Sequence, residues 1–159
     1  LALDEVKPDP PLLPDDPKLR ADNHILEDWA DESLYFLALH HRWVEPAGRR
    51  EASRIFPQPL ATVLGPAIAR MARRQLHAQG TGRKPLDKVA RDLERLLAAV
   101  ATRLGNGYLL GAQPYLCDFA LMGQLVYLGR TPAGAKAIAR HASIGRYLEQ
   151  MRALRAGNG

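Results

Sequence analysis

The side chains of this chain best suited to chemistry are five histidines, one cysteine and a group of acids near residue 30. His40 and His41 are adjacent, and on a helix they would project about 100° apart, so we expect them to share no metal ion. The HxxxH and Cys–His spacings that hold zinc are absent from the sequence. The sequence therefore predicts no metal site.

Two further candidates have a simple structural interpretation. Cys117 lies near the start of an expected helix, where the dipole favours a thiolate, but no histidine is near it in sequence to act as a base. We interpret it as a small buried side chain. Asp28 and Glu32 are four residues apart and would share a helical face with repulsive charges unless solvent or a cation relieves them. With Asp31 they form an acidic group suited to acid–base chemistry, which we interpret as a solvated or cleft-facing patch.

The glycine-rich stretch 105–111 is similar to a dinucleotide loop only at first sight. It is one residue too long for GxGxxG and follows an expected helix instead of a strand. Residues 80–84 lack the spacing of a phosphate-binding loop and the Ser or Thr that should follow. Both stretches are predicted to be structural loops.

Composition fits one soluble globular domain of 159 residues, with 47% hydrophobic and 25% charged residues. No apolar run approaches the roughly 18 residues of a membrane span, so we expect no membrane segment. A single cysteine excludes an internal disulfide and suits a reducing compartment, which predicts a cytoplasmic location.

Charge is unevenly distributed along the chain. Residues 1–35 hold ten acidic and three basic side chains, whereas residues 36–159 hold seven acidic and nineteen basic ones. A basic surface attracts nucleic acid nonspecifically, but the basic residues are scattered along helical stretches and never form a run of four. We therefore expect solvated helix faces and no nucleic-acid partner. The opposite charges of the two segments favour antiparallel pairing of two copies.

Helical periodicity dominates the sequence, and no strand alternation or internal repeat is found. A proline-rich connector over 8–17 is followed by a bent helix from Pro17, capped by Asp16, to about Val44, and Pro46–Gly48 should end it. Further helices are expected over 57–79, with a possible break at Gly65-Pro66, and over 85–104, 115–129, a short stretch after Thr131 and a last stretch capped by Ser143. The predicted fold class is an all-α helical bundle.

The stretch 108–121, Tyr-Leu-Leu-Gly-Ala-Gln-Pro-Tyr-Leu-Cys-Asp-Phe-Ala-Leu, resembles the C-terminal helical domain of glutathione transferases. That family has an aromatic-leucine-glycine loop followed by Ser/Thr-x-Ala-Asp at the start of a buried helix. Residues 20–29 are similar to the family's first C-terminal helix, and residues 144–151 are similar to a late one. Residues 31–35 resemble the metaxin-like and failed-axon-like branch.

The resemblance implies that residues 1–16 are the end of a thioredoxin-like domain plus the linker, and that residues 17–159 are the helical domain. That domain forms the wall of the electrophile pocket and part of a homodimer interface, while the parent protein uses glutathione as co-substrate. The residues that activate glutathione would lie before Leu1, so we expect this chain alone to bind no cofactor and to catalyse no conjugation. The resemblance places five residues in substrate binding, with Asp28 facing the amino group of glutathione: Asp28, Tyr35, Phe36, Leu39 and Tyr127.

One departure from the family concerns the start of the buried helix. Tyr115 stands where the family has Ser or Thr, so the hydroxyl half of the capping box is lost. Asp118 can still accept from the backbone N–H of Tyr115, and Gln113 is the candidate substitute for the hydroxyl. Because the same helical domain also serves in assemblies without catalysis, a noncatalytic protein-interaction module remains the alternative function.

Overall fold

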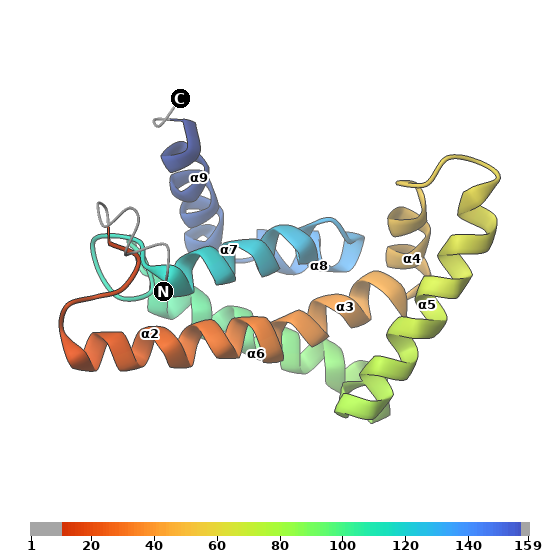
Figure 1. Cartoon of the computed structure of the whole chain (residues 1–159), viewed down its shortest axis with the longest axis horizontal. Coiled ribbons are helices and arrows are strands. Elements are labelled where there is room, and N and C mark those ends of the chain that lie inside the picture. Colours follow the sequence, from red (N-terminus) through yellow and green to blue (C-terminus); the bar gives the residue numbers. More distant parts are fainter. Residues whose placement is uncertain (1–10, 157–159) are drawn as a thin grey trace.

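The computed structural model describes residues 11–156, with side chains to residue 154, and this part of the chain contains helices and no strand (Figure 1). The prediction of an all-α bundle is confirmed. The expected end of a preceding domain, residues 1–6, lies outside the described residues. The helical elements are α2 (Pro17–Trp29), a π-helical segment (Ala30–Leu34), α3 (Tyr35–Trp43), α4 (Pro46–Ser53), α5 (Leu60–Gln79), a 3₁₀ turn (Thr81–Arg83), α6 (Leu86–Leu104), α7 (Leu116–Gly129), α8 (Pro132–Ala139) and α9 (Ala142–Ala156).

The long first helix starts as predicted. Oδ1 of Asp16 accepts a 2.8 Å hydrogen bond from the backbone N–H of Leu19, and Pro17 occupies the first helical position. The helix runs through the π-helical segment Ala30–Leu34 into α3. The expectation that Pro46–Gly48 merely ends it was incomplete. The helix ends at Trp43, and Pro46 begins α4, because the fixed φ of proline suits the first turn of a helix.

The predicted break in α5 does not occur, and the helix continues through Pro66. Gly65 is buried against α4, where an added Cβ would lie 2.5 Å from Oγ of Ser53. The missing side chain therefore allows α5 to pack closely on α4. Gly80 ends α5 with a φ of 118°, a left-handed conformation that glycine adopts without strain.

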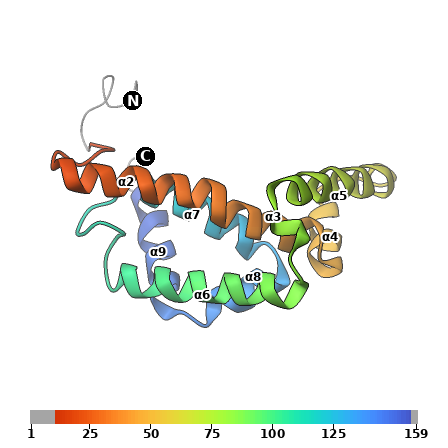
Figure 2. The ribbon, with the colours of Figure 1, turned by 90° about the horizontal axis from the view of Figure 1, so that it is seen from below.

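The main hydrophobic cluster lies between α6, α7 and α9, with α2 and α3 covering it (Figure 2). The helix predicted over 85–104 is α6, and most of its large apolar side chains are buried, although Leu86 is 66% exposed and Leu96 is half-buried. On α9, Leu154 is exposed. The buried α6 residues are Val89, Leu93, Leu97, Val100 and Leu104.

A second cluster joins α3 to α4 and α5, which form one end of the molecule in Figure 1. It contains Phe36, Leu39 and Trp43 of α3, while Leu37 and Ala38 of the same helix belong to the main cluster. Every residue of α3 from Phe36 to Trp43 is buried, so this helix has neighbours on all sides. α3 is therefore the structural link between the two cores.

The ends of the last two helices differ in how they are held. The helix expected after Thr131 is α8, and Oγ of Thr131 caps it by accepting from the N–H of Gly134. The prediction for Ser143 was wrong, because α9 begins at Ala142 and the Ser143 hydroxyl donates to the carbonyl of Ala101 on α6. That hydroxyl ties α9 to α6 instead of capping its own helix.

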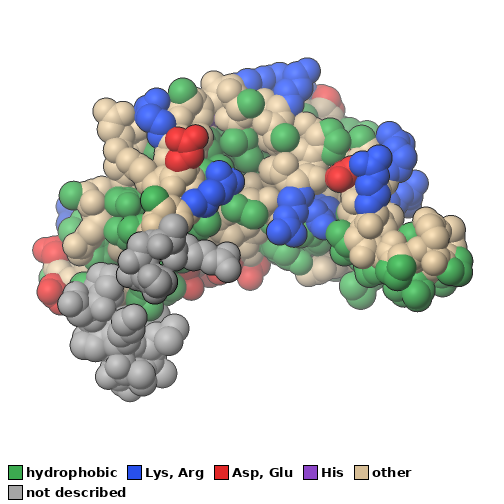
Figure 3. Space-filling view, turned by 90° about the horizontal axis from the view of Figure 1, so that it is seen from above, with side chains coloured by type: hydrophobic (Ala, Val, Ile, Leu, Met, Phe, Trp, Pro, Cys, Tyr) green, Lys and Arg blue, Asp and Glu red, His purple; other side chains and the backbone are tan. Residues whose placement is uncertain are grey.

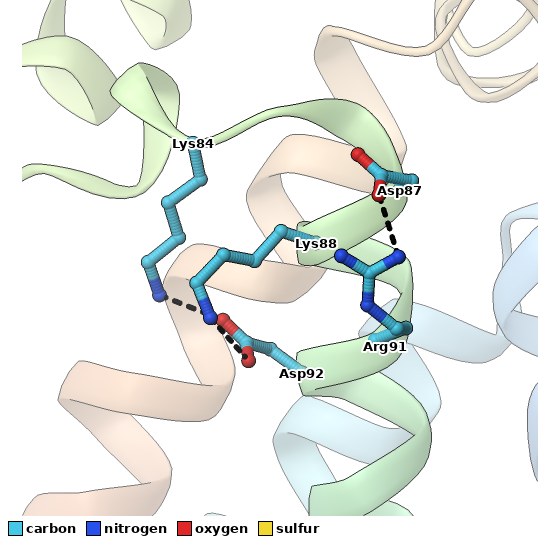
Figure 4. Close-up of polar contacts among 5 residues, drawn as sticks. All are labelled: Lys84, Asp87, Lys88, Arg91 and Asp92. Carbon is cyan, nitrogen blue, oxygen red and sulfur yellow. Dashed lines mark hydrogen bonds and ion pairs between the residues drawn. The ribbon is translucent and has the colours of Figure 1, made fainter.

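Three ion pairs connect residues at the start of α6 (Figure 4). The carboxylate of Asp92 accepts from Nζ of Lys84 at 2.9 Å and from Nζ of Lys88 at 3.3 Å, and Arg91 pairs with Asp87 at 2.5 Å. The Lys84 contact joins the turn before α6 to its second turn. None of the helices in the described range is long and apolar enough to cross a lipid bilayer.

Candidate functional site

Two of the five predicted substrate-binding residues lie together. The rings of Tyr35, at the start of α3, and Tyr127, near the end of α7, are stacked with centroids 6.4 Å apart and planes inclined by 27°. The rings of Tyr35 and Phe36 also meet edge to face, with centroids 5.1 Å apart. Both tyrosines are half-buried. The arrangement therefore exposes part of a fixed pair of aromatic rings.

Arg42 contacts one ring of this pair, that of Tyr127. Its guanidinium carbon lies 4.8 Å from the ring centroid of Tyr127 and 6.0 Å from that of Trp43, within the range of a cation–π interaction. The side chain is buried, and no carboxylate of the described residues lies within ion-pair distance of it. Burial raises the pKa of Tyr127, and the charge of Arg42 opposes that rise. The phenol therefore stays neutral at physiological pH.

The other three predicted residues lie elsewhere. Phe36 and Leu39 are buried in the second cluster, at 8% and 6% exposure, so they pack the α3–α5 contact. Asp28 is exposed on α2. Asp31, from the same acidic group, accepts a 3.0 Å hydrogen bond from Nε2 of Gln124 on α7. Two of the five residues form the aromatic pair, two belong to the hydrophobic core and one is a surface acid. None of the five lines either of the two cavities described in the following paragraphs.

A histidine–glutamate pair lines a cavity of about 400 Å³ between α3, α6 and α8. Nδ1 of His41 and Oε1 of Glu45 are 2.7 Å apart, and the His41 side chain is 4% exposed. The ring of His40 lies beside that of His41, with centroids 5.7 Å apart and planes at 80°. One donor atom from each of these three residues lies within 4.8 Å of the other two. The three donor atoms are therefore nearly as close together as the ligand atoms of a single metal ion.

The electrostatics of this cluster follow from its burial. Burial lowers the pKa of His40, and a charge on neighbouring His41 would lower it further. The hydrogen bond with His41 holds the pKa of Glu45 below its ordinary value. Among the described residues, Nδ1 of His40 and Nε2 of His41 are buried and have no hydrogen-bond partner. Two imidazole nitrogens are thus free to bind something else.

Sequence reasoning missed this cluster because it considered only the angle between the two adjacent histidines. Glu45 is four residues after His41 and lies beyond the end of α3, as the residue before α4. That spacing is the signal that could have found the pair, because side chains four apart meet on a helical turn. The packing of α6 and α8 over them could not be read from the sequence.

A second cavity, of about 610 Å³, is an arginine-lined groove on α4 and α5. Pro66 and Ala69 line its apolar part. Figure 3 shows Lys and Arg side chains next to hydrophobic ones at the end of the molecule where these two helices lie. The basic lining consists of Arg49, Arg70, Arg73, Arg74 and His77.

The predicted capping role of Asp118 is confirmed. Its Oδ2 accepts from the N–H of Tyr115 at 3.0 Å, and its Oδ1 accepts from the N–H of Leu109 at 2.9 Å. Gln113 does not replace the missing hydroxyl, since its Nε2 donates to the phenol of Tyr115. The N–H of Asp118 instead donates to the backbone carbonyl of Tyr115 at 2.9 Å. The carboxylate therefore fixes the loop before α7 as well as the start of the helix.

Comparison of the chain with protein-family models finds no match, and comparison with curated proteins finds no match either.

Proposed function

We propose that this chain is the helical domain of a glutathione-transferase-like protein and that Tyr35 and Tyr127 form the wall against which a hydrophobic electrophile lies. The observation that carries the proposal is the stacked tyrosine pair with Arg42 behind it. Aromatic rings offer a large contact area at a low entropic cost, because only two side-chain torsions must be fixed. An aromatic electrophile fits such a surface by stacking on it.

In this proposal the reactive thiol comes from glutathione held by a thioredoxin-like domain. The thiolate sulfur forms a bond to the electrophilic carbon, and the leaving group departs with the electron pair of the broken bond. Arg42 contributes by fixing Tyr127 and by lending positive charge beneath the ring. The cytoplasm, where glutathione is reduced, is the compartment that suits this chemistry.

Binding of S-(2,4-dinitrophenyl)glutathione, the product of conjugation to an aryl halide, tests the proposal. The dinitrophenyl group quenches tryptophan fluorescence, and Trp43 lies beside Arg42, so saturable quenching is expected. Tyr127→Leu should weaken binding by roughly 2- to 13-fold, because one aromatic stacking contact contributes about 0.5–1.5 kcal/mol beyond area burial.

Tyr115→Leu is the matched control, since Tyr115 is also a half-buried tyrosine but lies at the loop end of α7. Equal affinities in the Tyr127 and Tyr115 variants would refute the aromatic wall. Absence of saturable quenching by the unmodified chain would do the same.

The noncatalytic module is retained as a second candidate because of the α4–α5 end. Four large hydrophobic side chains there are 50–69% exposed, next to the arginine-lined groove. Several large exposed hydrophobic side chains at one end of a molecule favour the binding of a partner. The exposed residues are Ile55, Leu60, Val63 and Met71.

A second copy of the chain is the partner that charge favours, because the acidic side chains of α2 complement the arginines of α4 and α5. Sedimentation should show a homodimer at micromolar concentration and low salt. Association should weaken between about 0.05 and 0.5 M salt, as the screening length falls from roughly 14 to 4 Å. A monomer at every salt concentration would remove this candidate.

A further inference from the structure

We propose that His40, His41 and Glu45 bind one divalent transition-metal ion of the Zn²⁺ class, at the edge of the cavity between α3, α6 and α8. The proposed conjugation chemistry uses none of these residues. The proposal rests on the convergence of three donor side chains, on the unpartnered buried Nδ1 of His40 and on an adjoining cavity.

The donor set suits this class of metal. Two imidazole nitrogens and one carboxylate oxygen are ligands that zinc, cobalt and nickel accept. Zinc bonds of about 2.0–2.2 Å place two tetrahedral ligand atoms roughly 3.4 Å apart. The three donor atoms lie within 4.8 Å of one another, and His41 and Glu45 approach to 2.7 Å. Small side-chain rotations are sufficient to reach coordination distances. They must bring the most widely separated donor atoms closer together and move the donor atoms of His41 and Glu45 apart.

One imidazole nitrogen of the cluster is available to a metal ion. Metal binding needs neutral imidazole, so protons compete with the ion. Nδ1 of His40 is buried and lacks a partner among the described residues, and a buried polar atom left unpaired destabilises the fold. Coordination gives such atoms a partner.

The backbone around the cluster is tightly packed. Glu45 precedes α4, and Gly48 in the first turn of α4 packs on the carbonyl of His41, where an added Cβ would lie only 1.9 Å away. The junction of α3 and α4 therefore fixes the spacing between His41 and Glu45. A preorganised ligand pair loses less entropy when it binds an ion.

The charges that line the cavity decide how the remaining coordination positions are filled. Arg91 pairs with Asp87, and Arg140 pairs with Glu94. Lys136 is the lining cation without such a partner in the part of the chain that the structure describes. It weakens cation binding by repulsion, and it favours an anionic ligand, such as hydroxide or a carboxylate, as the outer ligand of the ion.

Titration of the full metal-free chain with Zn²⁺ in a calorimeter, and with Co²⁺ by visible absorption, tests the proposal. One ion should bind per chain, with the intense d–d bands of low-coordinate Co²⁺. Glu45→Gln should weaken binding by about 10–100-fold, and His41→Gln by at least as much. Lys136→Gln should tighten binding, a result that a purely structural role for the cluster would not produce.

His141→Gln is the matched control, because Nε2 of His141 is also buried and unpartnered among the described residues but lies outside the cluster. Circular dichroism of each metal-free variant shows whether it folds. If a histidine variant unfolds, the Glu45 and Lys136 variants decide the matter. Affinity that is equal in the His41 and His141 variants, or no saturable binding by the unmodified chain, would overturn the proposal.

Discussion

The hydroxyl of Tyr147 donates a 2.7 Å hydrogen bond to the backbone carbonyl of Asp118, and both side chains are buried. The carboxylate of Asp118 accepts from Leu109 and Tyr115 at the same time. One residue therefore joins the loop after α6, the start of α7 and the middle of α9. Burial raises the pKa of Asp118, while the two backbone hydrogen bonds act in the opposite direction.

Asp118→Asn should lower the free energy of unfolding by about 1–3 kcal/mol, because an amide offers one acceptor oxygen to two buried N–H donors. Asp118→Ala should cost at least as much. Tyr147→Phe should cost about 1 kcal/mol, the usual contribution of one hydrogen bond. Urea denaturation measures each value. Asp31→Asn is the control, since its contact with Gln124 is exposed, and it should change stability by less than about 0.5 kcal/mol.

Cys117 should be inert in the native protein. Burial raises the pKa of its thiol to about 12, and the neighbouring charge of Asp118 acts in the same direction. At pH 8 the thiolate fraction is then roughly a thousandfold lower than for a free cysteine, and only the thiolate reacts. Reaction with a disulfide reagent should therefore be slow in buffer and rapid in denaturant. Rapid labelling of the folded chain would show that Cys117 is accessible and contradict the structure.

Two glycines in helices should respond to alanine with opposite signs. Gly48 of α4 packs against the carbonyl of His41, so Gly48→Ala forces α4 away from α3 and should destabilise the chain by more than 2 kcal/mol, as overpacking does. Nothing lies within 4 Å of a Cβ added at Gly145 of α9, so Gly145→Ala should stabilise by about 0.5–1 kcal/mol through helix propensity. Thermal denaturation compares the two, and destabilisation by both would mean that α9 packs differently.

Local signals predicted much of the fold and little of the site. The cap at Asp16, the inner face of α6 and the hydrogen bonds of Asp118 follow from short-range periodicity and capping rules. The sequence pattern does not predict α4, because Pro46 can end one helix and also start the next. Ser143 was misassigned because its hydroxyl has a partner on another helix, Ala101, which sequence spacing cannot show.

The aromatic pair and the histidine cluster illustrate the same limit. Tyr35 and Tyr127 were named through the resemblance, yet their contact depends on how α3 packs against α7. Phe36 and Leu39 share their helix with Tyr35 but face a second core formed with α4 and α5, whose existence the sequence pattern did not reveal. Contacts between distant segments depend on tertiary packing, which periodicity alone does not specify.

The stability of the chain should fall in two stages as the pH is lowered, because of His40 and Glu45. Both pKa values are lowered on folding, from ordinary values of 6.5 and 4.5, so the unfolded chain binds protons that the folded chain does not. The contribution of His40 is complete above pH 6.5 and declines below it, and that of Glu45 declines below pH 4.5. Asp118 acts in the opposite sense, since burial raises its pKa and protonation then favours the folded state.

Urea midpoints between pH 8 and 4 should therefore be compared for the unmodified chain and for His40→Gln, which should lose the decline that starts near pH 6.5. His24→Gln, a change at an exposed histidine, is the control and should keep that decline, and identical pH profiles for the unmodified chain and His40→Gln would show that His40 titrates as it does in the unfolded chain.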